Sequence, residues 1–295
     1  MPTLRRRLSG LRVSGDTADE ISEHHQSKII TFQKWCNDNC LCVNATKTEC
    51  IIFNNSKKDI GDLKLHVDDQ TIQNTDCFKY LGISLDSKLS FKAHCVNMLQ
   101  KMSQRAYLIR RNRNIFTQYY TKIFCESLIL SVANYCISIW GLNNSCFMEK
   151  CDRIIRSVIK NIIIPASNVN KKCKRQNWQD LFELCNWFTT SERMTYSVLC
   201  FVKKHAYDPN SSLYQLFKPS FTYVDERLEK SFRKPHNFTV PTCRTSVGQS
   251  TLKNTAIGLW NTLSPELQNP DLHYERFSNM VSNTIIVQRL DPFTV

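Results

Sequence analysis

Short apolar runs separated by polar turns predict β-strands between residues 41 and 86. The run Cys50-Ile51-Ile52-Phe53 is short and β-branched, which predicts a strand buried on at least one face. Leu63–Val67 and Thr71-Ile72 flank the polar Asp68-Asp69-Gln70. An apolar run on each side of a short polar segment predicts a hairpin.

Two bends interrupt this part of the chain. Ala45-Thr46-Lys47-Thr48 predicts a turn before the first strand. Tyr80-Leu81-Gly82 predicts a tight bend, because glycine adopts backbone conformations that other residues avoid. Ile83 and Leu85 alternate with polar residues after this bend, so a further strand is expected. About four antiparallel strands are predicted in total.

Apolar residues spaced three and four apart predict helices in the rest of the chain. In one such segment Cys95, Leu99 and Met102 fall on a single face. In the next, Lys122 and Glu126 are spaced for a helical ion pair. The predicted helices span Thr17–Asn37 (with Asp16 or Thr17 as N-cap), Ser90–Arg113, Thr117–Trp140, Phe147–Ile164, Trp178–Trp187, Glu192–His205, Ser250–Leu263 and His273–Val287.

The order of these elements predicts an α+β fold with its strands near the N-terminus. Residues 1–10 carry no recognisable element, and residues 11–88 hold one helix and the strands. Residues 89–165 and 177–295 are predicted to be helical, apart from an extended arm at 217–248 that is rich in Pro, Thr, Phe and Arg. Residues 166–176 contain Lys171–Arg175 and no apolar periodicity, which predicts a basic linker.

The charge balance indicates a polyanionic partner. The 295 residues include 39 Lys and Arg against 26 Asp and Glu, a formal net charge of +13. Nucleic acid is the commonest partner of such a chain, and the alternative is a basic protein whose charge only aids solubility. Hydrophobic residues make up 42% of the chain, which argues against wholesale disorder.

The fourteen cysteines are interpreted as reduced thiols of a cytoplasmic or nuclear protein. They are scattered, and several lie inside apolar runs. Cys36, Cys40, Cys42 and Cys50 contain no Cys-x-x-Cys pair, so a zinc site is not predicted. No membrane span is predicted either, because the most apolar stretch, Ile123–Trp140, is short and contains Glu126 and Asn134.

Five segments together resemble a LINE-type (non-LTR retrotransposon, jockey-like) reverse transcriptase, in that family's order and spacing. They are Leu11–Thr17, similar to the strand and turn after the catalytic hairpin; Asn44–Thr48, similar to the fourth palm motif; Lys79–Ile83, similar to the fifth, the primer grip; Ser90–Trp140, similar to the thumb; and Trp260–Pro265, similar to the C-terminal Trp/Phe-Asn-x-Leu-Pro motif. The resemblance implies a palm remnant over residues 11–88, a helical thumb over 89–165 and a C-terminal helical domain.

Polymerisation by this family needs two divalent ions, Mg²⁺ in the intact enzymes, held by carboxylates. The resemblance places the aspartate hairpin immediately before Leu11, where this chain has Arg5–Gly10. Arg7 and Leu8 stand near the aspartate positions, and neither can bind a metal. No catalytic residue and no cofactor are therefore expected in this chain. Asp68 and Asp69 are an alternative metal-binding pair, although their position predicts a surface turn.

The resemblance also implies roles for particular residues. Lys47 corresponds to the lysine that positions, and could protonate, the departing pyrophosphate. The segment implied to hold the primer consists of Lys79, Tyr80, Leu81 and Gly82. The residues predicted to contact phosphates are Lys101, Arg105, Arg110, Arg111 and Arg113.

The function predicted from the sequence is a reverse-transcriptase fragment limited to binding an RNA or DNA duplex backbone. The alternatives are a helical protein-interaction module and a complete enzyme that uses Asp68 and Asp69. The palm remnant lacks a neighbouring strand, so self-association through its edge, near Ile51, Phe53 and Ile83, is a further prediction.

Overall fold

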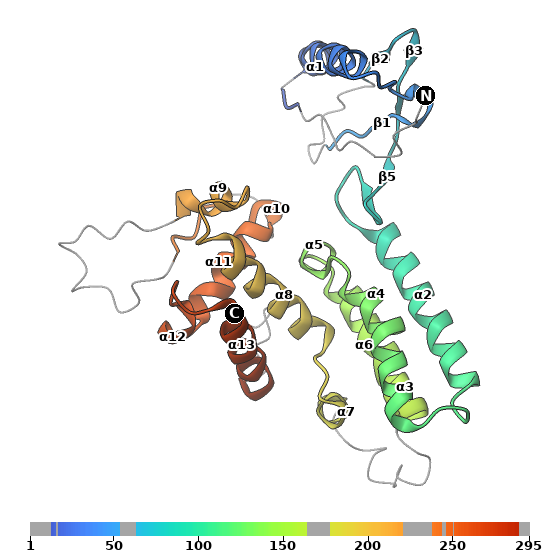
Figure 1. Ribbon diagram of the computed structural model, residues 1–295, viewed down its shortest axis with the longest axis vertical. Helices are drawn as coiled ribbons and strands as arrows, with labels where there is room; N and C mark the ends of the chain where they lie inside the picture. The colour runs from blue at the N-terminus through green and yellow to red at the C-terminus, as the bar shows by residue number, and fades with distance from the viewer. Residues whose placement is uncertain are drawn as a thin grey trace, which may run out of the picture. The chain divides into compact units, whose positions relative to one another are not determined.

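The structure is a computed structural model that describes residues 13–15, 17–53, 63–163, 178–220, 238–243, 246–249 and 251–288 (Figure 1). The chain divides into two compact units, Met1–His94 and Cys95–Val295. Helices and a few short strands are both present, which agrees with a mixed α and β class. The palm, thumb and linker assignments stay predictions. Arg7, Leu8 and the basic segment Lys171–Arg175 lie outside the described residues.

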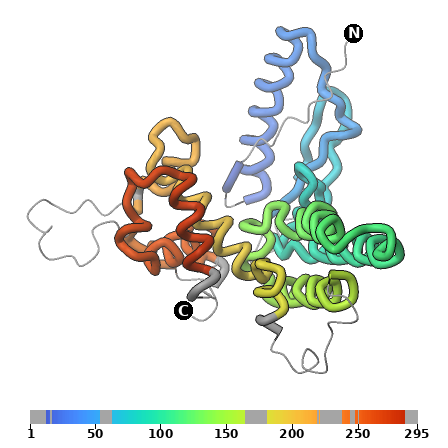
Figure 2. The backbone as a smooth tube through the Cα atoms, turned by 60° about the horizontal axis from the view of Figure 1, so that its bottom comes forward, coloured from blue at the N-terminus to red at the C-terminus, as the bar shows by residue number. Residues whose placement is uncertain are grey.

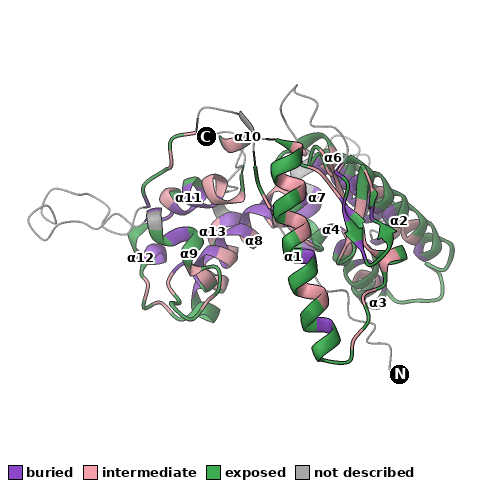
Figure 3. Cartoon of the chain, turned by 90° about the horizontal axis from the view of Figure 1, so that it is seen from above, coloured by how far each residue is buried: buried purple, intermediate pink, exposed green. Residues whose placement is uncertain are grey.

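Helix α1 (Ala18–Asp38) is the long element of the first unit, and most of its surface is exposed (Figure 3). Thr17 caps its start, because the hydroxyl accepts a hydrogen bond from the Glu20 amide at 3.3 Å. Ile29 packs into the apolar core, whose buried members are Ile29, Cys50, Leu63, Leu65, Val67 and Ile72. The Gln26 side chain donates to the His66 carbonyl and accepts from the His66 amide, which ties α1 to the edge of a strand.

In the described part of the first unit, six short strands form three separate pairs. They are β1 (Glu49–Cys50) with β4 (Gln73–Asn74), β2 (His66–Val67) with β3 (Gln70–Thr71), and β5 (Cys77–Tyr80) with β6 (Ile83–Asp86). The prediction of about four antiparallel strands was wrong, since β1 and β4 pair in parallel. The predicted turns are confirmed: Asp68 (φ 51°) closes the β2–β3 hairpin, and Leu81 (φ 45°) and Gly82 (φ 91°) close β5–β6.

The second unit begins within α2 (Lys92–Arg111), and the regular elements in its described part are helices. The next elements are α3 (Gln118–Cys125), a π-helical segment (Glu126–Leu130), α4 (Ser131–Asn134), α5 (Ile137–Trp140), α6 (Ser145–Val158) and a second π-helical segment (Ile159–Ile163). They are followed by α7 (Trp178–Cys185), α8 (Thr190–His205), α9 (Tyr214–Phe217), a 3₁₀ turn (Lys218–Ser220), α10 (Ser246–Gln249), α11 (Leu252–Thr262), α12 (Pro265–Gln268) and α13 (Tyr274–Gln288).

The predicted continuous helix Thr117–Trp140 is interrupted, and the prediction was wrong on this point. After the π-helical segment the chain leaves the helix at Tyr135, and Cys136 has a left-handed backbone (φ 51°). The indole nitrogen of the fully buried Trp140 donates to the Tyr135 carbonyl at 3.0 Å. The Tyr135 carbonyl therefore has a hydrogen-bond donor even though it makes no helical backbone bond. The chain can turn here without leaving that carbonyl unpaired.

Helix α8 is the packing centre of the second unit. It contacts α4, α5 and α6 on the preceding part of the chain and α11 and α13 on the following part. Figures 1 and 2 show α13 and α11 alongside α8. Its start is held by a capping box, in which Thr189 and Glu192 exchange hydrogen bonds between side chain and backbone at 2.8 and 3.2 Å.

A buried polar contact joins α8 to α6. The Asp152 carboxylate accepts hydrogen bonds from the Thr190 amide at 2.9 Å and the Thr190 hydroxyl at 2.6 Å. Burial raises the pKa of Asp152, while the Thr190 bonds and nearby Arg156 and Arg193 act in the opposite direction. Burial also disfavours the charged form of Arg193 and lowers its pKa to about 10, although neighbouring carboxylates raise that pKa. The α8 start is therefore a charged, desolvated junction.

The Trp260–Pro265 segment is explained by packing. Trp260 is fully buried between the rings of Phe238 and Phe277, with centroid distances of 5.9 and 5.7 Å. The Asn261 side chain accepts from the Phe238 amide and donates to its carbonyl. Pro265 begins α12, where a missing amide hydrogen costs nothing. Trp187 and Trp260 are both buried.

No helix in the described part of the chain is long and apolar enough to cross a membrane.

A matched pair of threonines tests the α6–α8 junction. Thr190→Val removes the hydroxyl bond to Asp152, so the free energy of unfolding should fall by about 1–3 kcal/mol, because a buried carboxylate is deprived of a donor. Thr195 is equally buried on α8, but its hydroxyl has no partner among the described residues. Thr195→Val should therefore be close to neutral. Urea unfolding of both variants measures the difference, and equal destabilisation would contradict the role given to Thr190.

Candidate nucleic-acid interface

The Asn44–Thr48 segment is a 3₁₀ turn held by its own first residue. The Asn44 side chain accepts hydrogen bonds from the Lys47 amide at 3.2 Å and the Thr46 hydroxyl at 2.7 Å. Asparagine at this position therefore replaces the missing first bonds of the turn. Lys47 is the last residue of the turn and is exposed.

The segment compared with the primer grip is the turn of the β5–β6 hairpin. Tyr80 faces Ile83 across the hairpin and is half-buried, whereas Lys79, on the opposite face of β5, is exposed. Leu81 and Gly82 form the exposed tip, and both have positive φ. The hairpin thus presents Lys79, Leu81 and Gly82 at its surface and uses Tyr80 for packing.

Asp86 connects the end of this hairpin to the start of α2. Its carboxylate accepts hydrogen bonds from the Ser90 amide at 2.9 Å and the Phe91 amide at 2.7 Å. Partial burial alone would raise the pKa of Asp86, but these bonds outweigh it, so the pKa lies below its ordinary value. Leu89 and Phe91 have left-handed backbones (φ 51° and 54°), and the carboxylate stabilises this strained entry.

The five cations predicted to contact phosphates do not share one environment. Arg105 donates to the Leu128 carbonyl at 2.7 Å, and Arg113 donates to the Asn161 carbonyl at 3.0 Å. Both carbonyls belong to π-helical segments, where the backbone hydrogen bonds are displaced by one residue. The side chains of Lys101, Arg110 and Arg111 are exposed and make no hydrogen bond or ion pair with the described residues. Sequence spacing had not distinguished these two groups.

No acidic residue lies between Asp86 and Glu126, a segment of 39 residues. The same segment holds eight Lys and Arg residues: Lys88, Lys92, Lys101, Arg105, Arg110, Arg111, Arg113 and Lys122. Lys122 forms the predicted ion pair with Glu126, at 4.0 Å. We call residues 87–125 the acid-free segment. Its α2 and α3 helices carry a positive surface without internal neutralisation, which is the charge pattern expected to attract a polyanion.

Asp68 and Asp69 lie in the exposed β2–β3 turn. The Asp68 carboxylate accepts a hydrogen bond from the Gln33 side chain at 2.7 Å, so it anchors α1 to the turn. Across the part of the chain that the structure describes, no three His, Cys, Asp or Glu side chains converge as a metal-binding group would. Cys36 and Cys50 are buried, while Cys40 and Cys42 are exposed.

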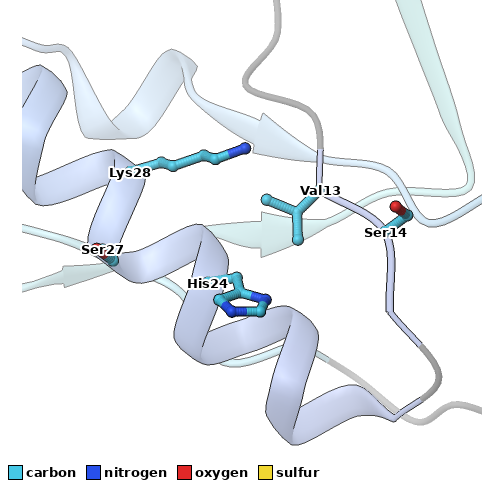
Figure 4. A pocket seen from close by; sticks show the side chains of 5 residues that line it. All are labelled: Val13, Ser14, His24, Ser27 and Lys28. Atoms are coloured by element: carbon cyan, nitrogen blue, oxygen red, sulfur yellow. The ribbon is translucent and has the colours of Figure 1, made fainter.

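A shallow depression in the first unit lies between Val13-Ser14 and α1 (Figure 4). His24, Ser27 and Lys28 of α1 line its other side. It brings together none of the residues predicted from the sequence to bind nucleic acid or metal. We assign it no role.

No family model matches the sequence, and no solved structure matches it significantly. The chain is similar to the RNA-directed DNA polymerase from mobile element jockey of Drosophila melanogaster, at 25% identity over 129 residues. The chain contains a reverse-transcriptase-related region. The match covers 42% of this chain and 14% of the polymerase, so the chain spans only a small part of that relative.

The lowered pKa of Asp86 predicts a pH-dependent hairpin–α2 junction. The pKa of Asp86 is lower in the folded state than in the unfolded chain, where it is about 4. The ionised carboxylate therefore stabilises the folded state fully above about pH 4, and this stabilisation is lost as the pH falls through the pKa of the folded state. Hydrogen exchange at the Ser90 and Phe91 amides, corrected for intrinsic rates, should therefore be slow at pH 6–7 in the wild type and accelerate below about pH 4.

Asp86→Asn removes the charge and one acceptor site, so exchange should be fast at every pH. Asp69→Asn, a change in the exposed β2–β3 turn, is the control. Identical exchange in the wild type and Asp86→Asn at pH 7 would disprove the capping role.

Proposed function

We propose that this chain is a fragment of a LINE-type RNA-directed DNA polymerase, and that it binds nucleic acid through the phosphate backbone. The similarity to the jockey polymerase supports the polymerase origin. The observation that carries the binding proposal is the acid-free segment, which has eight cations on 39 residues. Five of them have side chains that are exposed and unpaired within the described structure: Lys88, Lys92, Lys101, Arg110 and Arg111. Phosphate contacts need positive charge but little fixed geometry, which suits these long side chains.

The contact surface is proposed to lie on α2 around Lys101, Arg110 and Arg111. The apolar side of α2 is buried at Met98, Met102 and other positions, so packing fixes the helix without using these cations. Arg105 and Arg113 are proposed to position the surface by linking α2 and the following turn to the π-helical segments. The hairpin tip at Leu81-Gly82 remains a proposed second contact, by the resemblance to the primer grip.

The proposal does not include catalysis by this chain alone. The aspartates that hold Mg²⁺ in the intact family are proposed to lie outside this sequence, and Lys47 would act on pyrophosphate only beside them. Self-association through the first unit also stays a prediction. Of the three apolar residues named for that edge, Ile83 is buried and Phe53 is half-exposed.

Replacing the exposed Lys101, Arg110 and Arg111 of α2 tests the binding proposal. Lys101→Gln/Arg110→Gln/Arg111→Gln should lower the log–log salt slope of duplex affinity by up to about 2.7, because each phosphate that is no longer neutralised lowers it by roughly 0.9. The three side chains are exposed, so unfolding should be unchanged. Fluorescence anisotropy of a labelled duplex, titrated at several salt concentrations, gives the slope.

A control variant with the same change in net charge is Lys150→Gln/Lys204→Gln/Arg276→Gln, at exposed positions outside the acid-free segment. It should keep most of the slope. If the slope falls equally in both triple variants, binding follows net charge rather than α2. If it falls in neither, a helical protein-interaction module becomes the better account.

A primer-extension assay tests the absence of catalysis. The purified chain should incorporate no nucleotide on a primed RNA template with Mg²⁺ or Mn²⁺. Incorporation that disappears in Asp68→Ala/Asp69→Ala would overturn this prediction and make the β2–β3 turn a metal site.

A further inference from the structure

Exposed aromatic and aliphatic side chains gather where α2 turns into α3. Tyr107, Ile115, Tyr119 and Tyr120 are 64%, 73%, 69% and 55% exposed. They fall within 14 residues of the sequence, between the last turns of α2 and the first turn of α3. Single exposed apolar residues are common, but a group of this size on one turn marks an interaction surface.

The backbone of this corner is held in place. The Asn112 side chain donates to the Leu108 carbonyl at 2.9 Å, and the Ile115 amide donates to the Asn112 carbonyl at 3.0 Å. Phe116 packs on Phe124 with a centroid distance of 4.7 Å. The exposed rings therefore project from an ordered turn, which lowers the entropy cost of binding.

The tyrosines are exposed because the helices pack with their other sides. Helix α3 buries Thr121 and Cys125, so Tyr119 and Tyr120 face away from the packed side. Their rings meet edge to face at 5.4 Å, so this contact covers one face of one ring and leaves the other ring faces outside it. On α2, Tyr107 lies one turn before Arg111, and both are exposed.

The charge around these rings selects the partner. Arg110 and Arg111 end α2, and residues 87–125 around them contain no Asp or Glu. Aromatic rings interleaved with unpaired cations match a ligand that offers flat π-faces and phosphates together. In a duplex the base faces are covered by neighbouring bases, so only unpaired nucleotides can use both features.

We propose that the α2–α3 corner binds single-stranded nucleic acid, with bases stacked on Tyr119 and Tyr120 and phosphates beside Arg110 and Arg111. This inference rests on the proposed function, because it assigns a second substrate form to the same positive surface. A duplex contacts the α2 cations through its backbone, and an adjoining unpaired strand stacks on the tyrosines.

The test compares three probes on the full chain: an oligothymidylate of about 12 nucleotides, an abasic strand of the same length, and a duplex. The abasic strand keeps the phosphates and lacks the bases. The wild-type chain should bind oligothymidylate about tenfold or more tighter than the abasic strand, since each stacked base contributes substantially.

Tyr119→Leu/Tyr120→Leu should reduce oligothymidylate affinity to the abasic level and leave duplex affinity unchanged. Tyr119→Phe/Tyr120→Phe keeps the ring faces and should retain the wild-type preference. Tyr135→Leu, at another tyrosine that is 48% exposed, is the control outside the corner. Urea unfolding checks that each variant is folded.

Equal affinity of the wild type for oligothymidylate and the abasic strand would overturn the inference and leave the duplex proposal intact. Loss of preference in the Phe variant would also overturn it, since the ring faces are still present. If the wild type binds none of the probes with a salt dependence, the proposed function fails as well.

Discussion

The second unit depends on the contact between the Asp152 carboxylate and the start of α8. Thr190 donates to this carboxylate through its amide and its hydroxyl, so one side chain closes a helix end and joins it to α6. Helix α8 then packs on α4, α5, α11 and α13. A charge this deeply buried is costly unless it is hydrogen-bonded, so the junction favours one arrangement of the surrounding helices.

Arginine contacts extend this order to α2. Arg105 and Arg113 donate to carbonyls in the two π-helical segments. The sequence predicts phosphate contacts for both side chains instead. Of the five cations predicted to contact phosphates, Lys101, Arg110 and Arg111 remain exposed and unpaired within the described structure, on a helix whose apolar side is already packed. The two groups of cations differ in their surroundings. Those near a helix carbonyl stabilise the packing of the helices, and those facing solvent are available to a polyanion.

Local chemistry made much of the fold predictable from the sequence. Thr17 and the Leu81-Gly82 turn follow capping and turn rules that act over a few residues. The parallel pairing of β1 with β4 was not predictable, because two-residue strands carry too little pattern to specify a partner.

Predictions failed or remained incomplete where side-chain contacts outside regular helical spacing decide the outcome. The break at Tyr135–Cys136 depends on the indole of Trp140, and no propensity signals it. Arg105 and Leu128 are 23 residues apart, so their contact could not be foreseen from helical spacing. The exposure of Tyr119 and Tyr120 depends on which side of α3 packs, which the sequence pattern did not indicate.

Lysine acetylation, mapped by mass spectrometry with and without nucleic acid, tests the central claim most directly. The claim is that the acid-free segment is the nucleic-acid surface. Lys92 and Lys101 should be protected at low salt by a partly single-stranded duplex, and the protection should disappear at high salt. Lys150 and Lys204, exposed elsewhere, should react equally in both conditions. Protection of Lys150 and Lys204 with none at Lys92 and Lys101 would contradict the account.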